Sequence, residues 1–165
     1  MLEKIYSFEN GVLKFVHEEP FADELEFQNL LVDHPDLLSG ELVNPDYPRK
    51  WLLLQKEQTV PDGANPSKWF SLDHLFIDQD AIPTLVEVKR SSDTRARREV
   101  VGQMMDYAAN GVEYWSIDQI RENFEKDHPD DPQRYLANEL GLQAGEQEYE
   151  DFWALAVENF SEKKV

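Results

Sequence analysis

One stretch of the sequence decides the fold: residues 69–90 read WFSLDHLFIDQDAIPTLVEVKR. Two apolar runs, 69–77 and 83–90, flank the polar residues Asp78, Gln79 and Asp80. Short apolar runs rich in aromatic and β-branched residues, separated by turn-forming residues, are typical of strands. The stretch therefore predicts two strands joined by a tight turn.

The segments on either side extend this pattern. Upstream, WLLLQ at 51–55 predicts another buried strand, and residues 22–33 predict a helix with one apolar side. Downstream, a helix is predicted over 94–110, with Asp93 or Thr94 as its N-cap and Asn110-Gly111 at its end. The order helix, strand, strand, strand, helix predicts an α+β domain, an α/β sandwich.

The two ends of the chain differ in character. Near the N-terminus, strands at 4–8 and 12–16 flank the tight-turn dipeptide Asn10-Gly11, which predicts a hairpin. After residue 116 the chain is acidic, and helices are predicted at 117–127, 131–140 and 146–162. We therefore expect a core with its hairpin over 1–115 and an acidic helical extension over 116–165.

Composition narrows the class of protein. A chain of 165 residues, 41% hydrophobic, fits one globular domain. It has no cysteine and no apolar run long enough for a membrane span, which favours a cytoplasmic protein without disulfides or thiolate metal sites. The net charge of −18 opposes binding to phosphate polymers. Against that background, residues 89–98 hold five cations and a single acid.

Two carboxylates are expected to meet in the central strands. Side chains alternate along a strand, so a hairpin of the two strands can set Asp73 beside Glu87, with Lys89 on the same face as Glu87. Adjacent semi-buried carboxylates repel each other and require a proton or a hard cation. Oxygen ligands favour Mg²⁺ or Mn²⁺, and Lys89 would add a cation beside the metal. The simpler alternative is a surface strand end that carries a Glu and a Lys.

These residues resemble the motif of the PD-(D/E)XK nuclease superfamily, whose fold is a restriction-endonuclease-like αβββα core. The resemblance implies that Asp73 and Glu87 are metal ligands, that the Val88 carbonyl is another, and that Lys89 is the catalytic lysine. Leu72 stands where the family name has proline. A literal Pro61-Asp62 exists, but Pro-Asp-Gly is a turn signature, so we assign the role to Asp73 and keep Asp62 as the alternative.

Two further elements carry the resemblance. Gln103 and Tyr107 lie four apart on one face of the predicted helix and resemble the QxxxY motif of the RecB-like branch. Otherwise they are a backbone-satisfied Gln and a core Tyr. In the first helix, Glu24 resembles an acid that faces the metal, and Glu26 is the neighbour that could replace it. An exposed helix acid is the competing interpretation for both.

Together these features predict a metal-dependent nuclease with Mg²⁺ or Mn²⁺ as cofactor and nucleic acid, DNA before RNA, as partner. The basic island 89–98 would contact phosphates through four arginines: Arg90, Arg95, Arg97 and Arg98. Alternatively these arginines form a solvated helix end. The alternative functions are an inactive nuclease-fold binding module and an acidic protein that mimics nucleic acid. The family pattern also calls for another sheet strand after the second helix, which we expect from a downstream domain or a second chain.

Overall fold

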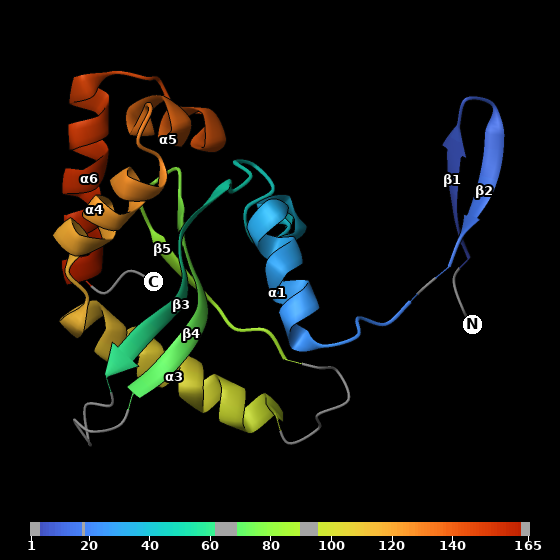
Figure 1. Ribbon diagram of the computed structural model, residues 1–165, viewed down its shortest axis with the longest axis horizontal. Helices are drawn as coiled ribbons and strands as arrows, with labels where there is room; N and C mark the ends of the chain where they lie inside the picture. Colours follow the sequence, from blue (N-terminus) through green and yellow to red (C-terminus); the bar gives the residue numbers. More distant parts are fainter. Residues whose placement is uncertain (1–3, 18, 62–68, 90–95, 163–165) are drawn as a thin grey trace.

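The computed structural model describes residues 4–17, 19–61, 69–89 and 96–162 (Figure 1). Within these ranges the side chains at 59–61, 69–70, 96–98 and 110–114 are not described. The chain is a mixed α+β protein with a two-stranded antiparallel sheet, a three-stranded antiparallel sheet and six α-helices among the described residues. No helix in the described ranges is long and apolar enough to cross a membrane.

The elements follow one another in the predicted order. The N-terminal hairpin consists of β1 (Ile5–Glu9) and β2 (Val12–Val16). The central part contains α1 (Glu24–Asp33), the 3₁₀ turn η1 (Pro35–Leu37), α2 (Gly40–Val43), β3 (Trp51–Pro61), β4 (Trp69–Asp78), β5 (Pro83–Val86) and α3 (Ala96–Tyr114). Three helices complete the chain: α4 (Ile117–Asp127), α5 (Pro132–Leu140) and α6 (Glu146–Ser161).

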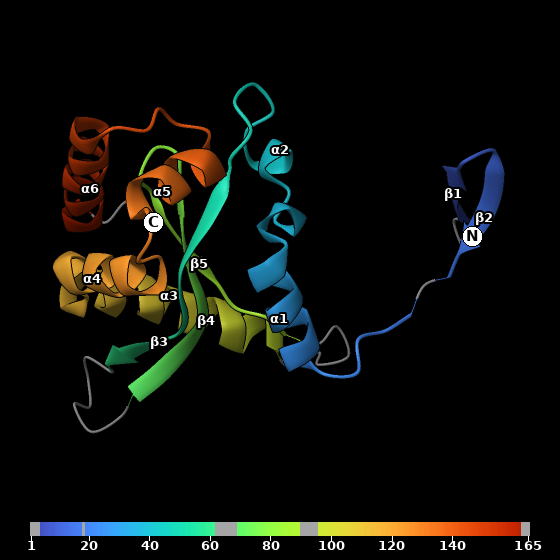
Figure 2. The same cartoon turned by 45° about the horizontal axis from the view of Figure 1, so that its top comes forward.

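The three-stranded sheet has the order β3-β4-β5 and lies between two groups of helices (Figures 1 and 2). Helix α1 covers one face, where the ring Nε2 of His74 is 2.9 Å from the carbonyl oxygen of Gln28. Helices α3 to α6 lie on the other side, and Leu75 and Ile77 point into their core. From Leu72 to Ile77, β4 is buried on both faces except at Asp73, so apolar residues occupy both sides of the strand.

One hydrophobic core joins the sheet to the C-terminal helices. Its members include Leu72 and Leu75 of β4, Phe124 of α4, Leu140 of α5 and Phe152 of α6. The acidic helical segment therefore packs on the sheet rather than standing apart from it. Its acids lie on the outer faces, while an apolar stripe on each helix is buried, which is the usual pattern of an amphipathic surface helix.

Several predicted boundaries agree with the structure. The hairpin turns at Asn10 and Gly11, both at positive φ, as a two-residue hairpin turn requires. Ser116 caps α4 by accepting a 3.3 Å hydrogen bond from the Gln119 amide. Gly141 ends α5 in the left-handed conformation at φ 67°. On α6 the buried apolar residues are Tyr149, Phe152, Trp153, Ala156 and Phe160, whereas Val157 is 48% exposed.

Other boundaries were predicted wrongly. Strand β5 ends at Val86, not at Arg90, and β3 continues to Pro61, not Gln55, because β4 supplies backbone partners along that whole length. Helix α3 runs past Asn110-Gly111 to Tyr114, and the buried Trp115 follows it in the core. A glycine inside a helix costs only about 1 kcal/mol, so packing overrides the stop signal. The predicted N-caps Asp93 and Thr94 lie outside the described residues.

Candidate active site

The two predicted carboxylates converge where β4 and β5 separate. The register pairs His74 with Val86, so one step further sets Glu87 opposite Asp73. There the ladder is replaced by a side-chain contact: the Val88 amide donates a 2.7 Å hydrogen bond to Oδ2 of Asp73. Glu87, Val88 and Lys89 therefore leave the strand with the Asp73 carboxylate beside their backbone.

The side chain of Glu87 is almost fully buried, with 3% of it exposed. Its Oε1 accepts a 2.6 Å hydrogen bond from Nζ of Lys89. Its Oε2 is also buried and has no hydrogen-bond partner among the described residues. Burial raises the pKa of Glu87, and the Asp73 charge raises it further, although the Lys89 hydrogen bond opposes both. An oxygen without a partner at such a position can accept a cation or a proton.

Lys89 connects the cluster to α1. One third of its side chain is exposed. Burial alone would lower the pKa of Lys89. The hydrogen bond to Glu87 and the charges of Glu87, Asp73 and Glu24 together outweigh burial, so the pKa is raised. Glu24, the first residue of α1, therefore lies within electrostatic range of Lys89. The structure brings Asp73, Glu87, Lys89 and Glu24 into one region.

Gln103 and Tyr107 join α3 to the same end of β4. Nε2 of Gln103 donates to the Tyr107 hydroxyl, which in turn donates a 3.0 Å hydrogen bond to the carbonyl oxygen of Ser71. Tyr107 is fully buried, and burial raises its pKa, with the charges of Glu87 and Asp73 adding to the effect. The pair holds the backbone of β4 two residues before Asp73. No sequence signal identifies Ser71, because its contribution is a backbone carbonyl.

Glu26 has a structural task instead. Its carboxylate accepts a 2.7 Å hydrogen bond from the Ala22 amide, and its own amide donates 2.9 Å to Oδ1 of Asp23. This arrangement is a variant of the capping box at the start of α1, in which Glu26 reaches the amide one residue before the N-cap Asp23, and the spacing of Asp23 and Glu26 could have indicated it. Glu26 is thus committed to the helix end, and of the two α1 acids it is Glu24 whose charge acts on Lys89.

Some predicted residues cannot be placed. Arg90, Arg95 and the alternative acid Asp62 lie outside the described residues. Arg97 and Arg98 belong to the first turn of α3, but their side chains are not described.

His74 is fully buried against α1, and Trp51, Trp115 and Trp153 are buried as well.

The cluster fits a divalent cation with few protein ligands. In the described ranges no group of three or more His, Cys, Asp and Glu side chains could hold a metal ion. Asp73 and Glu87 would therefore be the side-chain ligands, with the buried Oε2 of Glu87 as a free acceptor. Mg²⁺ commonly binds through one or two carboxylates and keeps several waters. The donor set suits Mg²⁺ or Mn²⁺ better than a metal that requires a closed protein cage.

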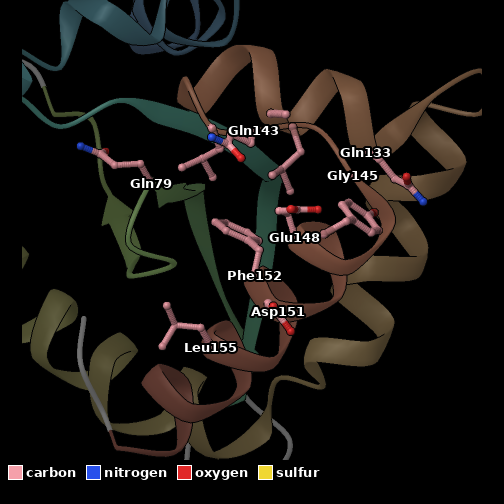
Figure 3. A pocket seen from close by; sticks show the side chains of 12 residues that line it. Gln79, Gln133, Gln143, Gly145, Glu148, Asp151, Phe152 and Leu155 are labelled. Atoms are coloured by element: carbon pink, nitrogen blue, oxygen red, sulfur yellow. The ribbon is translucent and has the colours of Figure 1, made fainter.

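A separate hollow lies between α5, α6 and the turn after β4 (Figure 3). Its volume is about 390 Å³, and its lining is mainly apolar, with Phe152, Leu155 and the stem of Glu148 around it. It contains none of the residues of the acidic cluster.

No family model, curated protein or solved structure matches this chain. The functional assignment therefore rests on the geometry of the acidic cluster and on the motif resemblance.

Proposed function

We propose that the chain is a Mg²⁺-dependent nuclease domain that hydrolyses phosphodiester bonds, with DNA as the preferred substrate. The observation that carries the proposal is the buried, unpartnered Oε2 of Glu87 beside Asp73 and Lys89. A purely structural Glu–Lys pair at a strand end gains nothing from burying a second acidic oxygen without a partner. A cation site uses that oxygen.

Each residue of the acidic cluster and of the Gln103–Tyr107 pair would have a distinct role. Asp73 and Glu87 would hold the cation, and the Val88 carbonyl is the third ligand by the motif resemblance. When bound, the cation would neutralise the carboxylates and supply a Lewis acid for the phosphate and the attacking water. The Val88 amide keeps the Asp73 carboxylate in one orientation. Gln103 and Tyr107 hold β4 against α3, so that Asp73 stays in register.

Lys89 can bind either the carboxylate of Glu87 or a phosphate of the substrate. In the structure its ammonium group is bound to Glu87. With Glu87 engaged elsewhere, the partly exposed side chain is free to reach a phosphate oxygen and to stabilise the charge that develops during hydrolysis. The charge of Glu24 is one of those that raise the pKa of Lys89.

One observation favours a second candidate, an inactive binding module of the same fold. The Glu87–Lys89 ion pair already neutralises one carboxylate, and the described residues provide no third acidic ligand. In that case the cluster would be a structural ion pair at the end of the sheet.

Metal binding and DNA cleavage distinguish the nuclease from the inactive binding module. Mn²⁺ binding is measured by calorimetry, and cleavage of supercoiled plasmid, single-stranded DNA and RNA is measured with Mg²⁺. We expect binding and DNA cleavage by the wild type, loss of both in Glu87→Gln, and neither change in the control Glu139→Gln, an exposed acid on α5. Equal metal binding and cleavage in wild type and Glu87→Gln would refute the nuclease. Absence of metal binding in the wild type would favour the binding module.

A further inference from the structure

The N-terminal hairpin carries an apolar face that no other part of the described chain covers. Its register pairs Tyr6 with Phe15 and Phe8 with Leu13, so these four side chains share one face. We call them the aromatic face. Their exposed fractions are 50%, 45%, 71% and 63% in that order, and the rings of Tyr6 and Phe15 lie 5.4 Å apart. In both views the hairpin stands away from the helices and the three-stranded sheet (Figures 1 and 2).

A hairpin of this kind needs a partner. Two isolated strands are marginally stable in water, and a hydrophobic face stabilises them only when it packs against something. Contiguous apolar patches on a protein surface commonly mark interaction sites. The opposite face is mixed and includes Ser7, Glu9 and Lys14, with an ion pair between the last two at 3.7 Å. Ile5, Val12 and Val16 lie on this opposite face too, so it mixes apolar with polar and charged residues, whereas the four side chains of the aromatic face carry no charge.

Charge determines where a second copy of the same chain can approach this one. Between residues 4 and 17 the hairpin has two lysines and one glutamate, a net charge of +1, so the rest of the chain carries −19. Two copies repel each other strongly except at their hairpins. The hairpins are held at a distance from the acidic bodies, so they can meet with the least repulsion. The aromatic face itself contains no charged residue, so its burial leaves no charge unpaired.

The size of the face agrees with a weak dimer. We infer that two hairpins pack their aromatic faces against each other around a twofold axis, as a small sandwich of two sheets. Four large side chains at these exposures, from each of two copies, bury roughly 900 Å², the range of transient interfaces. Salt should strengthen the dimer, because it screens the repulsion between the acidic bodies. An electrostatic partner such as nucleic acid would show the opposite salt dependence.

Sedimentation of the full chain tests the inference, over a concentration series from low to several hundred micromolar and at two salt concentrations. We expect a monomer–dimer equilibrium that strengthens with salt. The double variant Phe8→Ser, Leu13→Ser should weaken dimerisation by about 100-fold or more. The control Ile5→Ser, Val16→Ser changes two exposed apolar residues of the opposite face and should weaken it far less. A monomer at every concentration, or an equal loss in both double variants, would overturn the inference.

A second measurement does not depend on the stability of the serine variants. The chain has no cysteine, so single cysteines can be introduced and oxidised without side reactions. Leu13, Lys14 and Phe15 are consecutive in β2 and alternate between the two faces. Leu13→Cys or Phe15→Cys should form a disulfide-linked dimer at least about tenfold faster than Lys14→Cys, because only their sulfurs meet across the twofold axis. Equal rates for all three would show that the hairpins do not pack through this face.

Discussion

The amide of Val88 donates its hydrogen bond to the side chain of Asp73, at 2.7 Å, and not to a backbone carbonyl of β4. This contact replaces the next step of the ladder after the His74–Val86 pair. It explains why β5 is shorter than its apolar sequence predicts. It also places the carboxylate of Asp73 beside Glu87, so the end of the strand and the formation of the acidic cluster have the same cause.

The Asp73–Val88 contact leads to a prediction for stability. Asp73→Ala leaves the Val88 amide, on a residue only 6% exposed, without an acceptor. We expect a loss of about 1–2 kcal/mol in the free energy of unfolding. Asp73→Asn keeps an acceptor oxygen, so its free energy of unfolding should fall much less. Both variants should lose Mn²⁺ binding. Urea unfolding in EDTA measures the first effect and calorimetry the second. Equal stability of the Ala and Asn variants would show that the contact contributes nothing.

Glu87 should give the metal-free protein a recognisable pH dependence. Burial and the charge of Asp73 raise its pKa above the ordinary 4.5, so the folded protein binds this proton more tightly than the unfolded chain does. The free energy of unfolding should therefore fall as pH rises from about 4.5 through the raised pKa. The measurement is urea unfolding in EDTA across this range, for the wild type and for Glu87→Gln.

In Glu87→Gln this contribution is absent, so the difference in stability between variant and wild type should grow in favour of the variant as pH rises. The comparison cancels the other carboxylates of the chain, which titrate in both proteins. A difference that stays constant with pH would mean that the pKa of Glu87 is the same in the folded and unfolded states.

Lys89 should matter for hydrolysis and not for metal affinity. Its ammonium group occupies Oε1 of Glu87, so Lys89→Met frees that oxygen and should leave Mn²⁺ affinity equal or higher. DNA cleavage should fall by about 100-fold or more, as for the loss of one group that stabilises transition-state charge. The control is Lys126→Met, an exposed lysine of α4. Weaker Mn²⁺ binding together with unchanged cleavage would show that Lys89 supports metal binding and not hydrolysis.

The order of the central elements along the chain could be predicted from the sequence, because apolar residues mark β4 as a strand buried on both faces. From Leu72 to Ile77 this run is buried at every position except Asp73. Asp73 interrupts that run, and its position opposite Glu87 follows from the alternation of side chains along a strand. The central cluster could thus be identified before its geometry was known.

Other features depend on contacts that local sequence does not encode. Gly111 is a stop signal by itself, yet α3 passes through it, because tertiary packing outweighs a cost of about 1 kcal/mol. The end of β5 depends on a side chain fifteen residues earlier in the chain. Tyr107 bonds to the backbone of Ser71, an acceptor that any residue could supply. The capping role of Glu26, by contrast, was present in the sequence and was missed.

The basic island 89–98 is the basis of the last prediction. A protein of net charge −18 repels a phosphate polymer at long range, and salt at 0.1 M limits this repulsion to about 10 Å. Only a local cationic surface together with a bound divalent cation can make contact favourable. Few phosphate contacts are then available, so DNA binding by the chain should be weak and should require Mg²⁺ or Ca²⁺.

Charge reversal identifies the surface that makes this contact. The test variant replaces three cations of the island by glutamate: Arg95, Arg97 and Arg98. The control variant replaces three cations elsewhere by glutamate and reaches the same net charge: Lys14, Lys126 and Arg134. Fluorescence anisotropy with a short duplex, with Ca²⁺ in place of Mg²⁺ to prevent cleavage, should show binding lost in the first variant and only reduced in the second. Because both carry the same total charge, a difference between them reports the position of the contact. Equal loss in both variants would mean that net charge alone governs binding, and tight binding without a divalent cation would place the nucleic-acid surface elsewhere.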